Sequence, residues 1–269
     1  MFEIYAHTEI GLVRSANEDH MLVGRFIKNY GDMRIFFRNN DDFLYEHGLL
    51  FAVADGIGGE LGGAIASANA LWTLEQLFYP AKKNGEIQRI QSALIESITQ
   101  ANIALLQKGV ERPELARMGC TLAGICLTLQ GFLVFNCGDS RVYRYRHSHL
   151  KLLTEDDTVT QTAVRNGKMT MAEARRSEQR HRLTNFLGYT HFSCKINEHL
   201  LLREQDIILI CSDGLHDLLS DEEIEEILAN KEVNLPHMGQ QLAKRAIKKG
   251  GYDNISLILI RLDNSEQKW

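Results

Sequence analysis

Residues 49–63 read LLFAVADGIGGELGG, and this stretch decides the fold. Its first six residues are all apolar, which is typical of a buried strand, and the strand ends at Asp55-Gly56. The glycine-rich turn that follows leads into apolar residues at helical spacing over 63–78. The stretch therefore predicts a strand, a tight turn and a helix, with a carboxylate where the strand ends.

Acidic residues beside strand-like apolar runs recur along the whole chain. A carboxylate at the end of a buried strand is costly unless it is neutralised. Several could be neutralised together by divalent cations that prefer oxygen ligands. Each Asp-Gly alone is more often a turn than a ligand, so the joint pattern carries the prediction of metal-assisted chemistry. The other signatures are Glu18-Asp19 before the run 21–23, Asp139 after 132–137, Asp213-Gly214 after 207–211, and Asp253-Asn254 after a less clear run that ends at Tyr252.

The remaining periodicity separates strands from helices. Gln130-Gly131 predicts a tight hairpin between two strands, and Ser220 with Glu223 predicts a helix start by a capping box. This order of elements favours two packed sheets with helices outside over an alternating parallel sheet. Further strands are expected at 2–6, 33–37, 122–129, 142–145, 192–196 and 255–262, and helices at 87–107, 221–228 and 238–248.

Two polar segments are expected at the surface. Residues 154–187 contain two short helical stretches, 159–165 and 172–177, and are interpreted as an insert that could overhang a site. Residues 25–47 are longer and more polar than a simple connection needs. Their centre, 38–42, is expected to be a hairpin tip or loop, with a contact to a partner as the alternative, and no role is assigned to it.

Composition limits the classes of protein that the chain could represent. With 269 residues, 44% hydrophobic, and no linker-like stretch, one domain over 1–269 is expected. A net charge of −5 with dispersed Lys and Arg disfavours nucleic acid as a partner. No targeting segment and no apolar stretch of roughly 18 residues is present, so we expect a cytoplasmic protein without membrane contact. Five cysteines without a C-x-x-C pair indicate reduced thiols, and the ten histidines show no ligand spacing.

Eight motifs in order give the chain a family resemblance. Together they resemble the metal-dependent serine/threonine protein phosphatases, the PPM or type 2C family, in its compact bacterial form. The resemblance covers about residues 6–261 and implies an α+β fold: a four-layer α-β-β-α sandwich of two antiparallel sheets, with a small helical flap at about 156–187. The motifs are Arg14-x-x-Asn17-Glu18-Asp19, Asp55-Gly56-Ile57-Gly58-Gly59, Gly119-Cys120-Thr121, Gly138-Asp139-Ser140-Arg141-x-Tyr143, Leu153-Thr154-Glu155-Asp156, Leu183-Thr184-x-x-Leu187-Gly188, Cys211-Ser212-Asp213-Gly214-Leu215 and Asp253-Asn254-Ile255-Ser256.

The resemblance also implies roles for individual residues. Two Mn²⁺ or Mg²⁺ ions and a third, weaker one would be held by oxygen ligands, and a bridging hydroxide would attack phosphorus in line. Arg14 would clamp the phosphate oxygens. The expected catalytic residues are Arg14, Asp19 and Asp55; the expected metal ligands are Asp55 between two ions, Asp213 and Asp253 on the first, Glu18 and the Gly56 carbonyl on the second, and Asp139 with Asp213 on the third.

The implied function is hydrolysis of phosphoserine and phosphothreonine by a monomer that acts on phosphoproteins and opposes a cognate kinase. Two departures from the family pattern bear on the mechanism. Ile57 stands where animal-type relatives carry a histidine proposed as general acid, and Asp156-Asp157 stands where Asp-His is common, which is expected to affect flap anchoring. A pseudophosphatase that only binds phosphoproteins and a hydrolase of small phosphate esters are the alternative readings.

Overall fold

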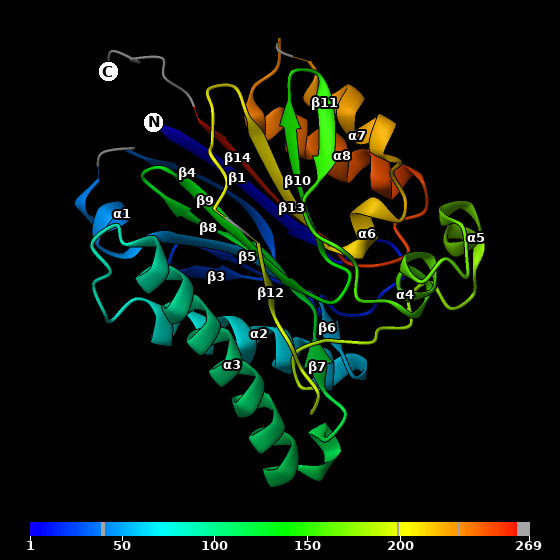
Figure 1. Ribbon diagram of the computed structural model, residues 1–269. Coiled ribbons are helices and arrows are strands. Elements are labelled where there is room, and N and C mark those ends of the chain that lie inside the picture. The colour runs from blue at the N-terminus through cyan, green and yellow to red at the C-terminus, as the bar shows by residue number, and fades with distance from the viewer. Residues whose placement is uncertain (39–40, 198, 231, 263–269) are drawn as a thin grey trace.

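Two antiparallel six-stranded sheets form the centre of the computed structural model, which describes residues 1–38, 41–197, 199–230 and 232–262 (Figure 1). The last strand of the chain pairs with the first, so the two ends of the sequence meet inside the first sheet. In spatial order the first sheet contains β11 (His149–Leu152), β10 (Arg141–Arg146), β13 (Ile207–Cys211), β14 (Ile255–Leu262), β1 (Phe2–Glu9) and β4 (Gly31–Phe37). The second contains β12 (Lys195–Ile196), β9 (Gly131–Cys137), β8 (Leu122–Thr128), β5 (Leu49–Ala54), β2 (His20–Val23) and β3 (Phe26–Lys28).

Helices cover the outer face of each sheet and complete four layers (Figure 1). Helices α2 (Gly59–Phe78) and α3 (Ile87–Glu111) pack on the second sheet, and α7 (Asp221–Leu228) and α8 (Leu235–Lys248) pack on the first. A third apolar cluster lies between the sheets. The predicted α-β-β-α sandwich is confirmed. The smaller elements are α1 (Asp42–His47), the pair β6 (Gly56–Ile57) and β7 (Gly119–Cys120), a 3₁₀ turn (Pro113–Leu115), α4 (Val159–Arg165), α5 (Met171–Arg176) and α6 (Asp213–His216).

Strand β5 shows why the opening stretch of sequence is apolar throughout. All six of its residues are buried, because one face meets the other sheet and the opposite face meets the helices. Phe51 belongs to the cluster between the sheets, whereas Leu50 and Ala52 belong to the cluster under α2 and α3. A strand covered on both faces therefore loses the polar alternation of a half-exposed strand.

Several predicted boundaries are wrong. The strand-like run expected to end at Tyr252 is not a strand, because α8 runs to Lys248 and a turn follows it. Of the strand expected at 192–196, only Lys195–Ile196 pairs. Residues 39–40 of the loop expected at 38–42 lie outside the described residues, and Asp41 caps α1, which the sequence did not predict. Helix α8 begins three residues early, at Leu235, because the Asn234 side chain accepts the His237 amide N–H.

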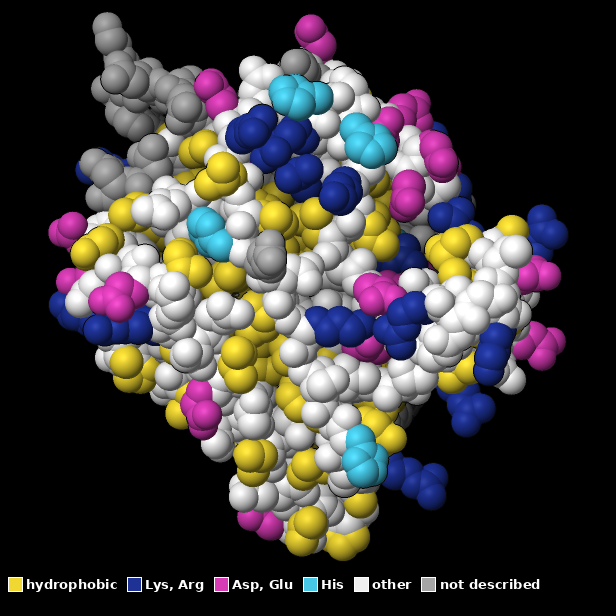
Figure 2. Space-filling model, in the orientation of Figure 1, with side chains coloured by type: hydrophobic (Ala, Val, Ile, Leu, Met, Phe, Trp, Pro, Cys, Tyr) yellow, Lys and Arg dark blue, Asp and Glu magenta, His cyan; other side chains and the backbone are white. Residues whose placement is uncertain are grey.

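The surface is mixed in charge. On the face in Figure 2, Asp and Glu lie among Lys and Arg, except for one group of basic side chains over β10 and β11. Within the described residues, no helix has the length and apolar composition to cross a membrane. All five cysteines are free thiols, as predicted, and four of them are buried.

Candidate metal centre

The acidic signatures meet at one end of the sandwich, although they come from both sheets. Asp55 and Gly56 follow β5, and Glu18 precedes β2, which pairs antiparallel with β5 so that both sites share an edge. Asp213 follows β13 and Asp253 lies just before β14, at the same edge of the first sheet. The antiparallel register thus brings strand ends distant in sequence together.

A cleft of about 420 Å³ contains these side chains. It gathers every predicted metal ligand and the predicted phosphate clamp. Asp19, expected to be catalytic, is not in the lining, because its side chain is completely buried and accepts a hydrogen bond of 2.7 Å from the Ser212 hydroxyl. The lining residues are Arg14, Glu18, Asp55, Gly56, Ile57, Gly58, Gly59, Thr121, Asp139, His181, Leu183, Phe186, Asp213 and Asp253.

The electrostatics of the cleft are unfavourable for so many carboxylates. Burial raises the pKa of Asp55 well above its ordinary value, and the surrounding aspartates raise it further. Burial, followed by the charge of Asp213, raises the pKa of Asp139. For Asp213, burial and then the charge of Asp217 raise the pKa to about 7. A bound cation would favour the ionised form of these carboxylates and would therefore lower their pKa values.

The residues present fit divalent cations. Asp213 Oδ1 and Asp19 Oδ1 are buried and accept no hydrogen bond within the described chain. Asp139, Asp213 and the flap residue His181 each offer a ligand atom, and the three atoms lie within 4.8 Å of one another. Carboxylate and carbonyl oxygens are the donors that Mg²⁺ and Mn²⁺ prefer. The oxygen ligands of the cleft therefore suit the predicted ions, and the His181 imidazole lies next to Asp139 and Asp213.

Two glycines let the second helix approach the strand ends. A Cβ on Gly63 of α2 would stand 2.7 Å from Glu18 Oε1 and 2.9 Å from the Gly56 carbonyl carbon. A Cβ on Gly56 would stand 2.3 Å from the Gly63 carbonyl oxygen. The absence of both side chains thus places the Glu18 carboxylate and the Gly56 backbone next to each other.

Asn254 ties the two ends of the chain together at the cleft. Its amide group donates 3.0 Å hydrogen bonds to the carbonyls of Ile10 and Ala16, and its carbonyl accepts the Glu18 amide N–H at 2.8 Å. The side chain is buried, so its removal would leave these backbone groups without partners. The Asp-Asn motif singled out this residue in the sequence, but its positioning role was not predicted.

Thr121, between β7 and β8, and Ser67 of α2 hold the strand ends. The Asp55 amide N–H donates to Thr121 Oγ1 at 3.1 Å, and the Thr121 amide N–H donates to the Asp55 carbonyl at 2.8 Å. The Ser67 hydroxyl of α2 donates to the Glu18 carbonyl at 2.5 Å. Nothing in the sequence indicated Ser67, because its helical position is ordinary.

Arg14 lies at the rim of the cleft. Its guanidinium donates to Asp253 Oδ2 at 2.5 Å, and about half of its side chain is exposed. The exposed part leaves donors free to meet a ligand that enters from solvent. This placement agrees with the predicted phosphate clamp.

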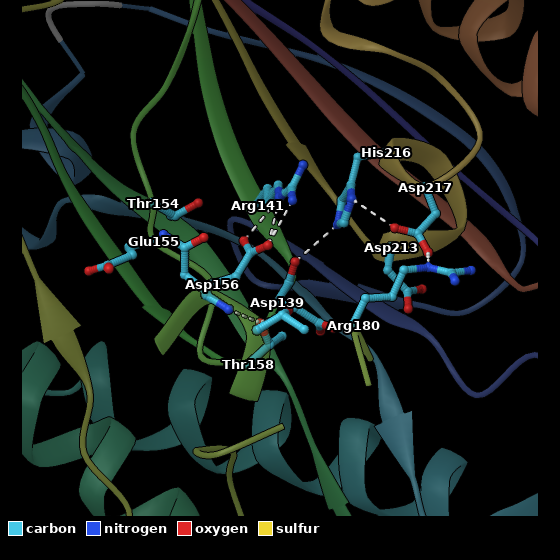
Figure 3. Close-up of polar contacts among 12 residues, drawn as sticks. Asp139, Arg141, Thr154, Glu155, Asp156, Thr158, Arg180, Asp213, His216 and Asp217 are labelled. Atoms are coloured by element: carbon cyan, nitrogen blue, oxygen red, sulfur yellow. Dashed lines mark hydrogen bonds and ion pairs between the residues drawn. The ribbon is translucent and has the colours of Figure 1, made fainter. Parts of the chain in front are cut away.

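Figure 3 shows the polar contacts behind Asp139. The ring of His216, whose side chain is 3% exposed, donates from Nε2 to the Asp139 carbonyl at 3.0 Å. Burial, and then the charge of Arg141, lower the pKa of His216 well below its ordinary value, so the ring is neutral near pH 7. Arg141 forms a bidentate ion pair with Asp156, in which Nε and Nη2 lie 3.0 and 2.7 Å from the carboxylate oxygens (Figure 3).

The flap, residues 158–182, is anchored at its base by Asp157. Asp157 Oδ2 accepts from the Gly138 amide at 3.2 Å and from Asn185 Nδ2 at 2.7 Å, and Oδ1 accepts from Lys195 Nζ at 2.6 Å. The second aspartate of Asp156-Asp157 therefore replaces the expected histidine with a carboxylate that has three partners. At the C-terminal end of the flap, Arg180 and His181 face Asp217 of the α6 region at 4.0 and 3.3 Å.

The sandwich, the acidic cleft and the rim arginine agree with the family that the motifs resemble. The chain belongs to the protein phosphatase 2C family, whose model matches residues 38–249. It is 32% identical over 225 residues to the serine/threonine protein phosphatase PstP of Mycobacterium tuberculosis, an alignment that covers 82% of this chain. The chain spans about two fifths of that relative, since the alignment covers 42% of PstP.

Solved structures resemble the whole chain. The S. agalactiae serine/threonine phosphatase superposes with a TM-score of 0.84 at 27% identity and covers 98% of this chain and 100% of its own. The PstP catalytic domain, described in complex with two manganese ions, gives a TM-score of 0.74 at 28% identity and covers 97% of this chain and 99% of its own. The family resemblance read from the motifs is confirmed.

Proposed function

We propose that the protein is a metal-dependent phosphatase that hydrolyses phosphoserine and phosphothreonine in proteins. The observation that carries this proposal is the convergence of Asp55, Asp139, Asp213, Asp253 and Glu18 in one cleft with an exposed arginine at its rim. The relatives that share the fold are described as serine/threonine phosphatases, which supports the same reaction.

In this proposal the cleft residues act as predicted from the motifs. Asp55, Asp213 and Asp253 would hold one ion, and Asp55, Glu18 and the Gly56 carbonyl would hold a second. Mn²⁺ or Mg²⁺ bound there would supply an activated water at neutral pH and stabilise charge on the phosphoryl oxygens. Asp139 with Asp213 would hold a third ion, for which the nearby imidazole of His181 is a further donor.

The protein's own side chains bind and orient the phosphate. Arg14 donates to the phosphoryl oxygens and stabilises the negative charge that grows in the transition state. Asp253 fixes the guanidinium through the 2.5 Å contact. Asp19 is a positioning residue in this scheme, because it contacts Ser212 behind the cleft rather than the substrate.

No side-chain nucleophile is needed in this scheme. Thr121 carries a hydroxyl into the cleft lining, but its oxygen accepts the Asp55 amide and lies 2.7 Å from Ser140 Oγ, so it is committed to structure. Ile57 also lines the cleft and cannot donate a proton. Protonation of the leaving alkoxide is therefore assigned to solvent rather than to a side chain at position 57.

We further propose that the protein works in the cytoplasm as a monomer and opposes a Ser/Thr kinase. Five free thiols suit a reducing compartment. A phosphatase of phosphoproteins requires a kinase that supplies its substrates, and the sequence does not identify that kinase.

The test is turnover of a phosphothreonine peptide with Mn²⁺, with excess EDTA, and by Asp55→Asn. We expect hydrolysis that requires Mn²⁺ and is lost in Asp55→Asn, whereas the matched exposed variant Asp42→Asn retains it. Turnover of small phosphate esters alone would favour the small-ester reading. Metal binding by calorimetry without any turnover would refute the proposal and favour a pseudophosphatase.

A further inference from the structure

Beside the cleft, two loops present large apolar side chains to solvent. Leu12 and Val13 follow β1 and are 66% and 64% exposed, and Tyr252 precedes β14 and is 64% exposed. Scattered apolar residues are ordinary on a protein surface, but a contiguous apolar group beside a binding cleft usually marks an interaction site. We call Leu12, Val13 and Tyr252 the rim patch.

The two loops that carry the rim patch pack against each other. The Leu12 amide donates to the Gly251 carbonyl at 2.8 Å. The Leu12 side chain lies over Gly251, where Cγ is 3.2 Å from the place a Cβ would take. The Tyr252 ring folds over the neighbouring Gly250. Leu12 and Tyr252 therefore flank one Gly-Gly pair that joins them.

The loops are also held in place. Gly11 has φ of +78°, and a Cβ there would stand 2.3 Å from the Asp253 carbonyl oxygen, so this close approach requires glycine. The Asn254 side chain holds the Ile10 and Ala16 carbonyls on either side of the patch. The apolar side chains thus extend from an ordered support and do not need to be ordered when a ligand binds.

The position of the rim patch identifies what would cover it. In each loop the residue that follows the patch lines the cleft: Arg14 follows Val13, and Asp253 follows Tyr252. A peptide whose phosphoresidue enters the cleft on this side would therefore pass over Leu12, Val13 or Tyr252. In an extended peptide, residues two apart point to the same side and lie about 7 Å apart.

We propose that the rim patch is a substrate subsite that binds an apolar side chain two positions from the phosphoserine or phosphothreonine. This inference rests on the proposed function and adds a substrate class to it. The apolar side chain would bury part of Leu12 and Tyr252 while the phosphate meets Arg14. Because such contacts form equally in the bound substrate and the transition state, their effect is expected mainly on KM.

The test compares phosphothreonine peptides that carry leucine or serine at both the −2 and +2 positions. With Mn²⁺ we expect wild-type kcat/KM to favour the leucine peptide by about tenfold, as expected for partial burial of one large apolar side chain. Leu12→Ser and Tyr252→Ser are each expected to remove most of this preference. Val110→Ser on α3, where the valine is 83% exposed, is the matched control and is expected to keep it.

Each outcome has a separate meaning. Equal kcat/KM for both wild-type peptides, or a preference that survives Leu12→Ser and Tyr252→Ser, would overturn the subsite. Sedimentation that shows a dimer broken by Leu12→Ser would assign the patch to a second copy and overturn it as well. If neither the peptides nor p-nitrophenyl phosphate is hydrolysed, the proposed function itself fails, and this result differs from loss of preference alone.

Discussion

Replacing Gly63 with alanine should disturb the candidate metal centre without unfolding the protein. The new Cβ would stand 2.7 Å from Glu18 Oε1, so the carboxylate must withdraw by about 0.7 Å to reach an ordinary contact of 3.4 Å. The new Cβ would also stand 2.9 Å from the Gly56 carbonyl carbon, so it is in close contact with the Gly56 backbone as well. Both proposed ligands of the second ion are therefore displaced by one methyl group.

The expected magnitudes separate stability from metal binding. Forcing a methyl group into a packed site costs about 1–3 kcal/mol, whereas alanine gains up to about 1 kcal/mol over glycine within a helix. The free energy of unfolding should thus fall by no more than about 3 kcal/mol. A ligand displaced by most of an ångström should weaken metal binding by roughly 10- to 100-fold.

The assay is a Mn²⁺ titration followed by both calorimetry and peptide turnover, with urea unfolding of the same samples. Gly62→Ala is the matched control, because a Cβ there meets Met118 Cβ at an ordinary 3.5 Å. It should bind Mn²⁺ like the wild type. An unchanged Mn²⁺ titration in Gly63→Ala, or an equal loss in Gly62→Ala, would refute the argument from close approach.

Three further variants test other parts of the structure. Asn254→Ala should lower the free energy of unfolding by about 3 kcal/mol in urea titrations, because buried backbone groups lose their partners; an effect below about 1 kcal/mol would contradict this. Burial lowers the pKa of His7, but its contacts with Glu9 and Asp32 outweigh that effect and raise it, so the associated stability should be present below about pH 6.5 and disappear as pH rises through the raised pKa. Urea unfolding of His7→Gln at pH 5.5 and 8.5 should show a smaller pH difference than the wild type. Asp157→Ala should free the base of the flap and accelerate tryptic cleavage within it by about tenfold, since three contacts are lost; unchanged cleavage would show that the flap is anchored elsewhere.

Elements that are apolar and sharply bounded could be predicted from the sequence. The bounds of β5, β13 and β14 were predicted correctly, because β5 and β13 are continuous apolar runs, β14 is mainly apolar, and they border Asp, Ser or Asn. The predicted capping box of α7 is present, with the Ser220 and Glu223 contacts both formed. In these cases local chemistry and tertiary burial favour the same structure.

Short strands and tertiary contacts could not be predicted in the same way. Strand β3 has three residues at a sheet edge, none of them buried, so it lacks the apolar pattern of a covered strand, whereas residues 33–37 of the edge strand β4 were predicted. Helix α6 has four residues, too few for a helical period to appear. His181 reaches Asp213 only through the path of the flap, and no spacing in the sequence records that approach.

The pairing of the first strand with the last has a consequence for how the protein is made. Strand β1 lies between β14 and β4, so a nascent chain can form only the β4 side until residue 262 has left the ribosome. The contact between Glu18 and Asn254 joins positions 236 residues apart. Contacts of such sequence separation form late in folding. A nascent chain that has not yet formed these contacts therefore lacks the complete acidic cleft. We expect that it cannot dephosphorylate proteins by the proposed reaction.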